Sequence, residues 1–236
     1  MADTSRLGLP LVDPAQAQKH VTVNEAFSRL DALTQLKLDG VGTSVPPASP
    51  VEGEVYAIGA GASGAWTGQD GKLGVLVNGG WAFVVPRKGW RGWSHPAGAE
   101  VLFDGVEWVA GAGALSPNGA GFVHRSLETD HAISAGATSV IAGALPANSI
   151  VYGITGRVLS AIGGAASLEI GVAGSTDRYG SGIGTGAGAW ARGITGTPLA
   201  YYAPTDLILS ASGGTFDGTG IFRVAVHFAE LTLPRA

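Results

Sequence analysis

Helical spacing of apolar residues is confined to the first forty residues of this chain. The apolar side chains that fall three and four residues apart, and so share one helical face, are Val23, Ala26, Phe27, Leu30 and Leu33. Beyond residue 40, glycine and proline interrupt the chain repeatedly; the whole sequence holds 39 glycines and 12 prolines. Strands and turns tolerate such interruption and helices do not. The sequence therefore predicts a mainly β protein with a short N-terminal α-helical segment.

Capping residues mark the expected ends of this segment. Asp13 with Gln16 is one start signal, Thr22 with Glu25 is a second, and Gly40 is the expected stop. A helix of about 16 residues cannot bury an apolar face alone. It should therefore pack on the β region of its own chain or on copies of itself.

A duplicated hairpin follows the proline-rich stretch 43–50. Residues 75–81 and 101–108 each contain an apolar run, an Asn-Gly or Asp-Gly turn, and a second run carrying Trp. This is the strongest short hairpin signal that a sequence offers. Residues 51–110 are thus predicted to form a small antiparallel, Trp-rich β-hairpin module, separate from an N-terminal segment at 1–45 that anchors or oligomerises the chain.

Small, flexible residues at 110–121 predict a second linker. The strands expected after it are Thr138–Ala142, Ser149–Leu159, Ser167–Ala173, Leu207–Ala211 and Ile221–Leu231. In the last of these, apolar and other residues alternate with the two-residue period of a half-buried strand. Strands separated by Gly-rich turns predict a C-terminal β-sandwich or jelly roll over residues 122–236.

Composition excludes several classes of protein. The absence of cysteine removes disulfide frameworks and thiolate metal sites. A net charge of −4 with scattered Lys and Arg disfavours nucleic-acid binding. The uncharged stretch 132–156 is broken by Gly and Pro, so no membrane insertion is expected. The N-terminus does not resemble a secretory signal, which predicts synthesis in the cytoplasm.

Five of the six tryptophans lie between Trp66 and Trp108. Indole faces stack on sugar rings, and Trp90 and Trp93 are the candidates for an exposed aromatic surface. The alternative is that a small module needs its tryptophans as core, with Trp81 and Trp108 favoured for that role. Packing of Arg91 on a tryptophan ring would equally explain why these residues occur together in the loop expected at residues 87–93.

A second candidate site combines charged and aromatic residues in a Gly-rich stretch that is expected to be a loop. Its predicted glycan-binding residues are Asp177, Arg178, Tyr179, Trp190, Arg192 and Tyr201. Planar charged groups bind pairs of sugar hydroxyls while an aromatic ring covers the apolar sugar face. The alternative is a surface loop whose aromatic residues serve packing.

Catalytic patterns are weak. Glu169, Asp177, Asp206 and Asp217 are carboxylates that a glycosidase could use, but no spacing selects a pair. The histidines show no metal-binding spacing, and no nucleophile elbow is present. We therefore expect that the protein is not an enzyme and that it binds no cofactor and no metal. The alternative is that it is a capsule depolymerase.

The N-terminal half carries a family resemblance. Residues 9–26 include the run Gln-Ala-Gln-Lys-His followed by Asn-Glu-Ala, and residues 30–33 continue it. Further pieces are Gly53–Tyr56, Gly64–Trp66 and Gly80–Pro86. Together, over residues 7–110, they resemble an uncharacterised family of bacteriophage-type structural proteins, found in prophages and in gene transfer agents. The part from Phe122 is similar to the C-terminal domain of head-spike or tail-fibre proteins of such particles.

The resemblance implies an adhesin built into a virion-like particle. Its N-terminal part would contact other particle structural proteins, and its C-terminal part would bind capsular polysaccharide on the cell surface. It would be a homo-oligomer: Val23 with Leu30, and Ala26 with Leu33, fit a seven-residue seam, which favours a trimer, with a pentamer as the alternative. The resemblance implies no catalytic motif. The other hypothesis is an architectural protein of the particle that binds no ligand.

Overall fold

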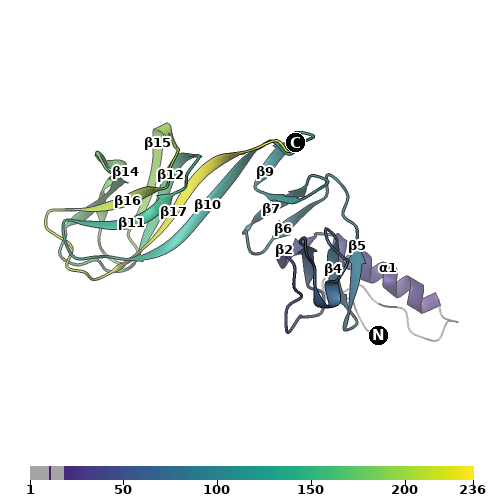
Figure 1. Cartoon of the computed structure of the whole chain (residues 1–236). Helices are drawn as coiled ribbons and strands as arrows, with labels where there is room; N and C mark the ends of the chain where they lie inside the picture. Colours follow the sequence, from purple (N-terminus) through teal and green to yellow (C-terminus); the bar gives the residue numbers. More distant parts are fainter. Residues whose placement is uncertain (1–10, 12–18) are drawn as a thin grey trace. The chain divides into compact units, whose positions relative to one another are not determined.

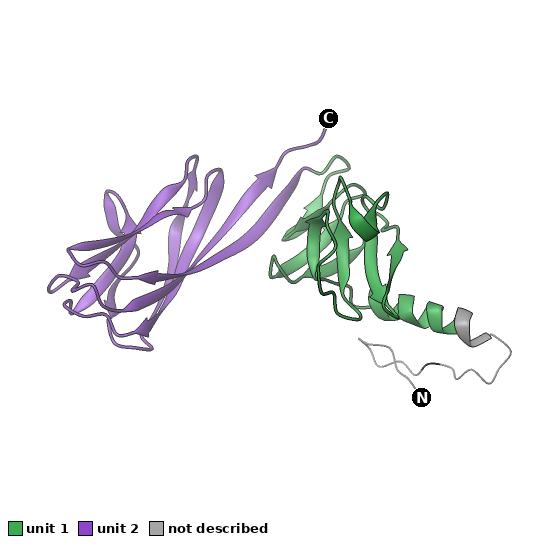
Figure 2. Cartoon of the chain, turned by 60° about the horizontal axis from the view of Figure 1, so that its bottom comes forward, with its two compact units in different colours: residues 1–119 green, residues 120–236 purple. Residues whose placement is uncertain are grey.

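The computed structural model describes residue 11 and residues 19–236. The chain divides into two compact units, residues 1–119 and 120–236, coloured separately in Figure 2. It is mainly β, with several antiparallel sheets and a short helix near the N-terminus, so the predicted fold class is confirmed. No helix within the described residues is long and apolar enough to cross a membrane. The capping signal at Asp13 and Gln16 lies outside the described residues.

Helix α1 spans Lys19–Leu33 and differs from the prediction at both ends. Thr22 lies within the helix and is not its N-cap, because the residues just before it contain no helix breaker. The helix ends well before Gly40: Gln35 has a φ of 54°, and this left-handed conformation after the last turn turns the chain away from the helix axis.

Gly40 has a different role from the predicted one. It begins strand β2, where a Cβ atom would lie 2.7 Å from Cδ1 of Tyr56 and 2.7 Å from Oγ1 of Thr43. The glycine allows close packing of the strand against the tyrosine ring.

Among the described side chains of α1, the buried ones lie in its C-terminal turn. Ala32 is buried and Leu33 packs against the same apolar cluster. Phe27 is partly buried, whereas Val23, Ala26 and Leu30 are exposed, Leu30 by 53%. Packing on the β region of the same chain therefore leaves these three residues of the apolar face uncovered.

Unit 1 contains two four-stranded sheets with the same plan. The first has the order β1-β6-β7-β8, and its strands are Lys37–Leu38, Arg91–Ser94, Ala99–Phe103 and Trp108–Ala110. The second has the order β2-β3-β4-β5, and its strands are Gly40–Thr43, Val55–Ile58, Leu73–Val77 and Gly80–Val84. A short 3-10 helix, η1, spans Gly64–Trp66.

Each of these sheets begins with a parallel pair, β1 with β6 and β2 with β3, and continues in antiparallel pairs. The duplication predicted for the hairpins therefore extends to whole sheets. Residues 37–43, which we expected in the helical segment, instead supply one parallel strand to each sheet. Asp39 alone separates these two strands.

Both predicted hairpins are present, with different turns. Asn78 and Gly79 have φ values of 52° and 72°, as a two-residue turn between β4 and β5 requires. The second hairpin pairs Phe103 with Trp108 across a longer loop. In that loop, Oδ1 of Asp104 accepts hydrogen bonds from the backbone N–H of Val106 and of Glu107, both at 2.9 Å.

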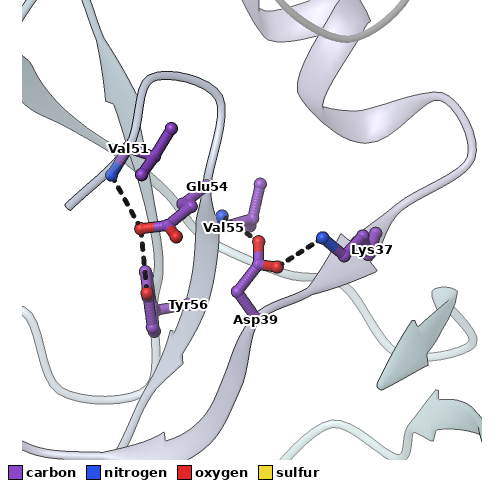
Figure 3. Close-up of polar contacts among 6 residues, drawn as sticks. All are labelled: Lys37, Asp39, Val51, Glu54, Val55 and Tyr56. Atoms are coloured by element: carbon purple, nitrogen blue, oxygen red, sulfur yellow. Dashed lines mark hydrogen bonds and ion pairs between the residues drawn. The ribbon is translucent and has the colours of Figure 1, made fainter. Parts of the chain in front are cut away.

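Carboxylates hold the segment before β3 in place (Figure 3). Asp39 accepts the backbone N–H of Val55 at 3.1 Å and pairs with Lys37 at 2.6 Å. Glu54 accepts the N–H of Val51 and the hydroxyl of Tyr56, each at 2.9 Å. Burial and the Glu54 carboxylate raise the pKa of Tyr56 to about 12, so this phenol stays protonated and keeps donating to Glu54 over the whole neutral range.

Unit 2 is built from two sheets that enclose one apolar core (Figure 1). One sheet has the order β15-β12-β17-β10, with strands Trp190–Tyr201, Ser149–Ser160, Ile221–Thr232 and Gly121–Ala132. The other has the order β11-β16-β13-β14, with strands Thr138–Leu145, Thr205–Ser212, Ser167–Val172 and Ser175–Gly184. The five strands predicted for this region are all present.

The core of unit 2 follows the predicted alternation. Phe222, Val224, Val226 and Phe228 of β17 are buried, while Arg223 between them is exposed. Aliphatic side chains of the opposite sheet, including Leu168 and Ile170 of β13 and Leu207 and Leu209 of β16, belong to the same cluster.

Four strands of residues 112–236 were not foreseen. Strand β10, Gly121–Ala132, lies in a stretch for which no strand was predicted. Strand β9, Ala112–Leu115, lies in the stretch predicted as a linker. Strands β14 and β15 replace the predicted Gly-rich loop. The expectation of a loop was wrong because glycine weakens the strand signal, although some of these glycines have a local reason. In β14, for example, Gly182 has a φ of 64° at a β-bulge, where the register against β13 shifts.

Candidate functional site

The candidate site lies where the edge strands of the two sheets of unit 2 meet. Strand β15 is the last strand of one sheet and β14 is the last strand of the other. At Gly193 of β15, a Cβ atom would lie 1.6 Å from the carbonyl oxygen of Tyr179 in β14. Only a glycine permits this approach, so the backbone of Gly193 fixes how closely the two edges come together.

A groove of about 640 Å³ runs along these two edges. Such a volume is in the range of small-molecule sites. Its lining includes Asp177, Arg178 and Tyr179 from β14, and Trp190 and Arg192 from β15. The structure therefore brings five of the six residues predicted for glycan binding to one groove, and Tyr201 is the exception.

Trp190 is an exposed aromatic residue at the groove. Its side chain is 61% exposed, and the guanidinium carbon of Arg192 lies 5.7 Å from the centre of its ring. The guanidinium groups of Arg178 and Arg192 form no ion pair with a described residue. The Nε atom of Arg178 is buried without a hydrogen-bond partner.

Tyr201 is not among the residues that line the groove, and Tyr179 lines it although its side chain is buried. Tyr179 is only 1% exposed and lies in the core, and its hydroxyl is 2.8 Å from the hydroxyl of the partly buried Tyr201. Burial and this hydrogen bond raise the pKa of Tyr179. Because strand side chains alternate between faces, Tyr179 points inward while its neighbour Arg178 contributes to the groove. The tyrosine pair instead links β14 to β15 from inside.

A second groove, of about 520 Å³, lies on the other side of β15, over the outer face of its sheet. It shares Trp190 and Arg192 with the first groove and adds Arg157, Arg223 and Glu128. Arg157 stands directly opposite Trp190 in the pairing of β12 with β15. Arg157 was not among the predicted site residues, although its place in a predicted strand, next to the buried Val158, already indicated an outward side chain.

Arg223, unlike Arg157, is held by carboxylates. Its Nε and Nη2 atoms donate to Asp130 at 2.6 and 2.7 Å, and Glu128 lies 3.7 Å away. The bidentate pair lowers the pKa of Asp130 and raises the pKa of Arg223. Its charge is thus already balanced.

The tryptophans of unit 1 are mostly packing residues. Trp66, which the sequence analysis did not single out as core, is completely buried, and Trp81 packs edge-on against it with ring centres 5.0 Å apart. Trp108 is half-buried against Phe103. Trp81 and Trp108, the expected core residues, are therefore partly exposed members of two separate sheets.

Of the two residues expected on an exposed aromatic surface, only Trp93 is open, at 50%. Trp90 is partly buried against the core cluster of unit 1. Arg91 forms an ion pair with Glu100 at 2.9 Å, which accounts for this side chain without a tryptophan partner.

The four candidate catalytic carboxylates serve different local structures. Glu169 accepts a hydrogen bond from the hydroxyl of Thr176, and Asp206 accepts one from the backbone N–H of Gly143. Asp217 accepts hydrogen bonds from both the backbone N–H and the hydroxyl of Thr219. The last two bonds lower the pKa of Asp217, which disfavours it as a proton donor. Asp177 is the member of this set that lines the groove.

Among the comparisons with known proteins, a family model matches part of unit 1. Residues 23–109 match a family described as a protein of unknown function (DUF2793). The match lies within residues 7–110, which carry the resemblance noted above, and within unit 1. None of the curated proteins compared with the chain matches it.

Two solved structures show weak similarity. The cyanophage Pam1 capsid asymmetric unit has 21% identity and a TM-score of 0.34, covering 50% of this chain and 91% of its own. A Bacillus endospore appendage, described as a novel family of disulfide-linked pili, has 17% identity and a TM-score of 0.23, covering 50% of this chain and 96% of its own. Neither score is high enough to carry a fold or a function over to this chain.

Proposed function

We propose that this protein is a non-enzymatic structural adhesin, a head spike or tail fibre of a phage-like particle such as a gene transfer agent. Unit 2 would attach the particle to capsular polysaccharide on the host cell surface. Unit 1 and its helix would hold identical chains together and contact other structural proteins of the particle. The observation that carries the proposal is the groove in which the exposed Trp190 lies beside Arg178, Arg192 and Asp177.

Sugar binding suits this groove because its two kinds of side chain do different work. The indole of Trp190 covers the apolar face of a sugar ring. The planar groups of Arg178, Arg192 and Asp177 form paired hydrogen bonds with hydroxyls at the ring's edge. The groove is open along two strands, which suits a chain that enters and leaves it.

Self-association would cover the apolar face of α1. Val23, Ala26 and Leu30 are exposed, and Val23 and Leu30 are seven residues apart, the repeat of a coiled-coil seam. Each sugar contact is weak, and several linked copies multiply the strength of attachment. A trimer is the favoured state and a pentamer is the alternative.

The test is attachment of labelled full-length protein to encapsulated cells of the source organism and to the same cells stripped of capsule. We expect binding that is lost with the capsule and lost again in Trp190→Ala. Tyr202→Ala is the matched control, because Tyr202 is also an exposed aromatic residue of unit 2 but does not line either groove.

Equal binding to both kinds of cell would contradict a polysaccharide receptor. New reducing ends after incubation with capsule would favour a depolymerase instead. Absence of binding by an oligomeric protein would favour a ligand-free architectural role.

A further inference from the structure

Unpaired positive charge gathers around Trp190. Arg178 lies in the first groove, Arg157 in the second, and Arg192 in both. None of the three forms an ion pair with a described residue. Other arginines of the chain do: Arg91 with Glu100, Arg125 with Glu230, and Arg223 with Asp130.

The strand pairing places these charges on both sides of the indole. Arg157 is directly opposite Trp190 in the pairing of β12 with β15, and Arg192 is opposite Thr155, the next outward position of β12. Arg178 approaches from β14, across the first groove. A sugar ring stacked on Trp190 would therefore have guanidinium groups around it.

The acidic residues of the two grooves do not cancel this charge. Glu128, in the second groove, lies 3.7 Å from Arg223, and Asp177, in the first, is a single carboxylate beside Arg178 and Arg192. The whole chain has a net charge of −4, so this positive surface is a local feature. Guanidinium groups bind planar, negatively charged oxygen groups in a bidentate way, more strongly than they bind neutral hydroxyls.

We infer that the ligand is an acidic polysaccharide, in which carboxylate or phosphate groups next to the stacked sugar bind Arg157, Arg178 and Arg192. The inference rests on the proposed function, because it names the class of glycan that the same site takes. Nucleic acid fits less well, since its binding relies on many phosphate contacts along an extended basic surface.

The test measures binding of the full-length protein to pairs of polysaccharides that differ only in charge. Polygalacturonate is compared with its methyl ester, and phosphomannan with unphosphorylated mannan. We expect at least one acidic form to bind about tenfold or more tightly than its neutral partner, as the loss of one charge-assisted contact predicts. The pair that shows the difference identifies the anionic group as carboxylate or phosphate.

Variants then locate the effect. Arg178→Gln and Arg192→Gln should each weaken binding to the acidic form severalfold and leave the melting temperature unchanged. Arg125→Gln is the matched control, because Arg125 is an arginine of unit 2 that lines neither groove.

Three outcomes would overturn the inference, and they differ in what they mean for the proposed function. Equal binding of charged and neutral forms, still lost in Trp190→Ala, would leave a glycan adhesin without charge preference. Equally tight binding of double-stranded DNA or dextran sulfate would show charge attraction alone. No binding to any of the polysaccharides or to encapsulated cells would remove the proposed function as well.

Discussion

The two units use tryptophan in opposite ways. Unit 1 holds five of the six tryptophans, and Trp66 at its centre is completely buried. Unit 2 holds only Trp190, which is 61% exposed. The strands of unit 1 are at most five residues long, whereas several strands of unit 2 have twelve.

This difference has a physical cause. Short strands offer few inward positions, so each must carry a large side chain to exclude water. Two long sheets of Val, Ile, Leu and Phe make a core without tryptophan. The lesson is that a single tryptophan outside a complete core is a better guide to a binding surface than a cluster of tryptophans in a small domain.

The largest effect should come from replacing the buried Trp66 by alanine, and the exposed Trp190 provides the contrast. Trp66→Ala should destabilise unit 1 by about 3–5 kcal/mol through the cavity it leaves. Trp190→Ala should change stability by less than about 0.5 kcal/mol, as expected for an exposed residue. Hydrogen exchange resolved along the chain measures both effects. Loss of protection in unit 2 on removing Trp190 would contradict its role as a surface residue.

A glycine pair on β15 tests how closely the two sheets of unit 2 must approach. Gly193→Ala would place a Cβ atom against the carbonyl of Tyr179 and should cost about 1–3 kcal/mol as the edges move apart. Gly196, on the same strand, has nothing within 4 Å of its Cβ position. Urea unfolding of Gly193→Ala and Gly196→Ala should therefore differ clearly, and equal midpoints would argue against the close contact.

Removal of the inner hydroxyl pair should have a smaller effect. In Tyr179→Phe the ring is kept and the 2.8 Å bond to Tyr201 is lost, which should cost about 1 kcal/mol of unfolding free energy. Capsule binding should be unchanged, because this side chain lies in the core. If binding fell while stability held, Tyr179 would have to be returned to the site.

The smallest effect should be a pH dependence confined to unit 2. Burial lowers the pKa of His131, whose Nε2 is 2.7 Å from the hydroxyl of Ser139; that hydroxyl already accepts the N–H of Ser134. The folded state then binds fewer protons than the unfolded state. Stability should be complete above the ordinary histidine pKa of about 6.5 and should fall as the pH drops below it.

His131→Gln should remove this part of the acid sensitivity, as measured by thermal unfolding between pH 5 and pH 8. An unaltered pH profile would show that His131 does not titrate differently in the two states.

Much of the fold could be predicted because its signals are local. The alternation in 221–231 and the Asn78-Gly79 turn each specify their own backbone, and both are confirmed. Strands β14 and β15 could not be predicted, because the need for Gly193 arises from a carbonyl fourteen residues earlier in the chain. Local propensity does not contain such a contact.

The candidate site was predictable in part for the same reason. Asp177, Arg178, Trp190 and Arg192 stand out by their residue types in a sparsely charged region, and the structure brings them to one groove. Tyr179 has an equally suitable type but faces the core, and Arg157 joins the surface only through the pairing of β12 with β15. The directions of the side chains in β14 and β15 depend on two strands that were not predicted.

Hydrogen exchange of the full-length protein with and without purified capsular polysaccharide is the sharpest test of the groove as the polysaccharide site. We expect added protection to be concentrated in residues 177–194, with the neighbouring part of β12 around Arg157, and we expect Trp190→Ala to abolish it. Protection centred on Trp93 in unit 1, or none at concentrations where cells are bound, would contradict the assignment of the groove as the polysaccharide site.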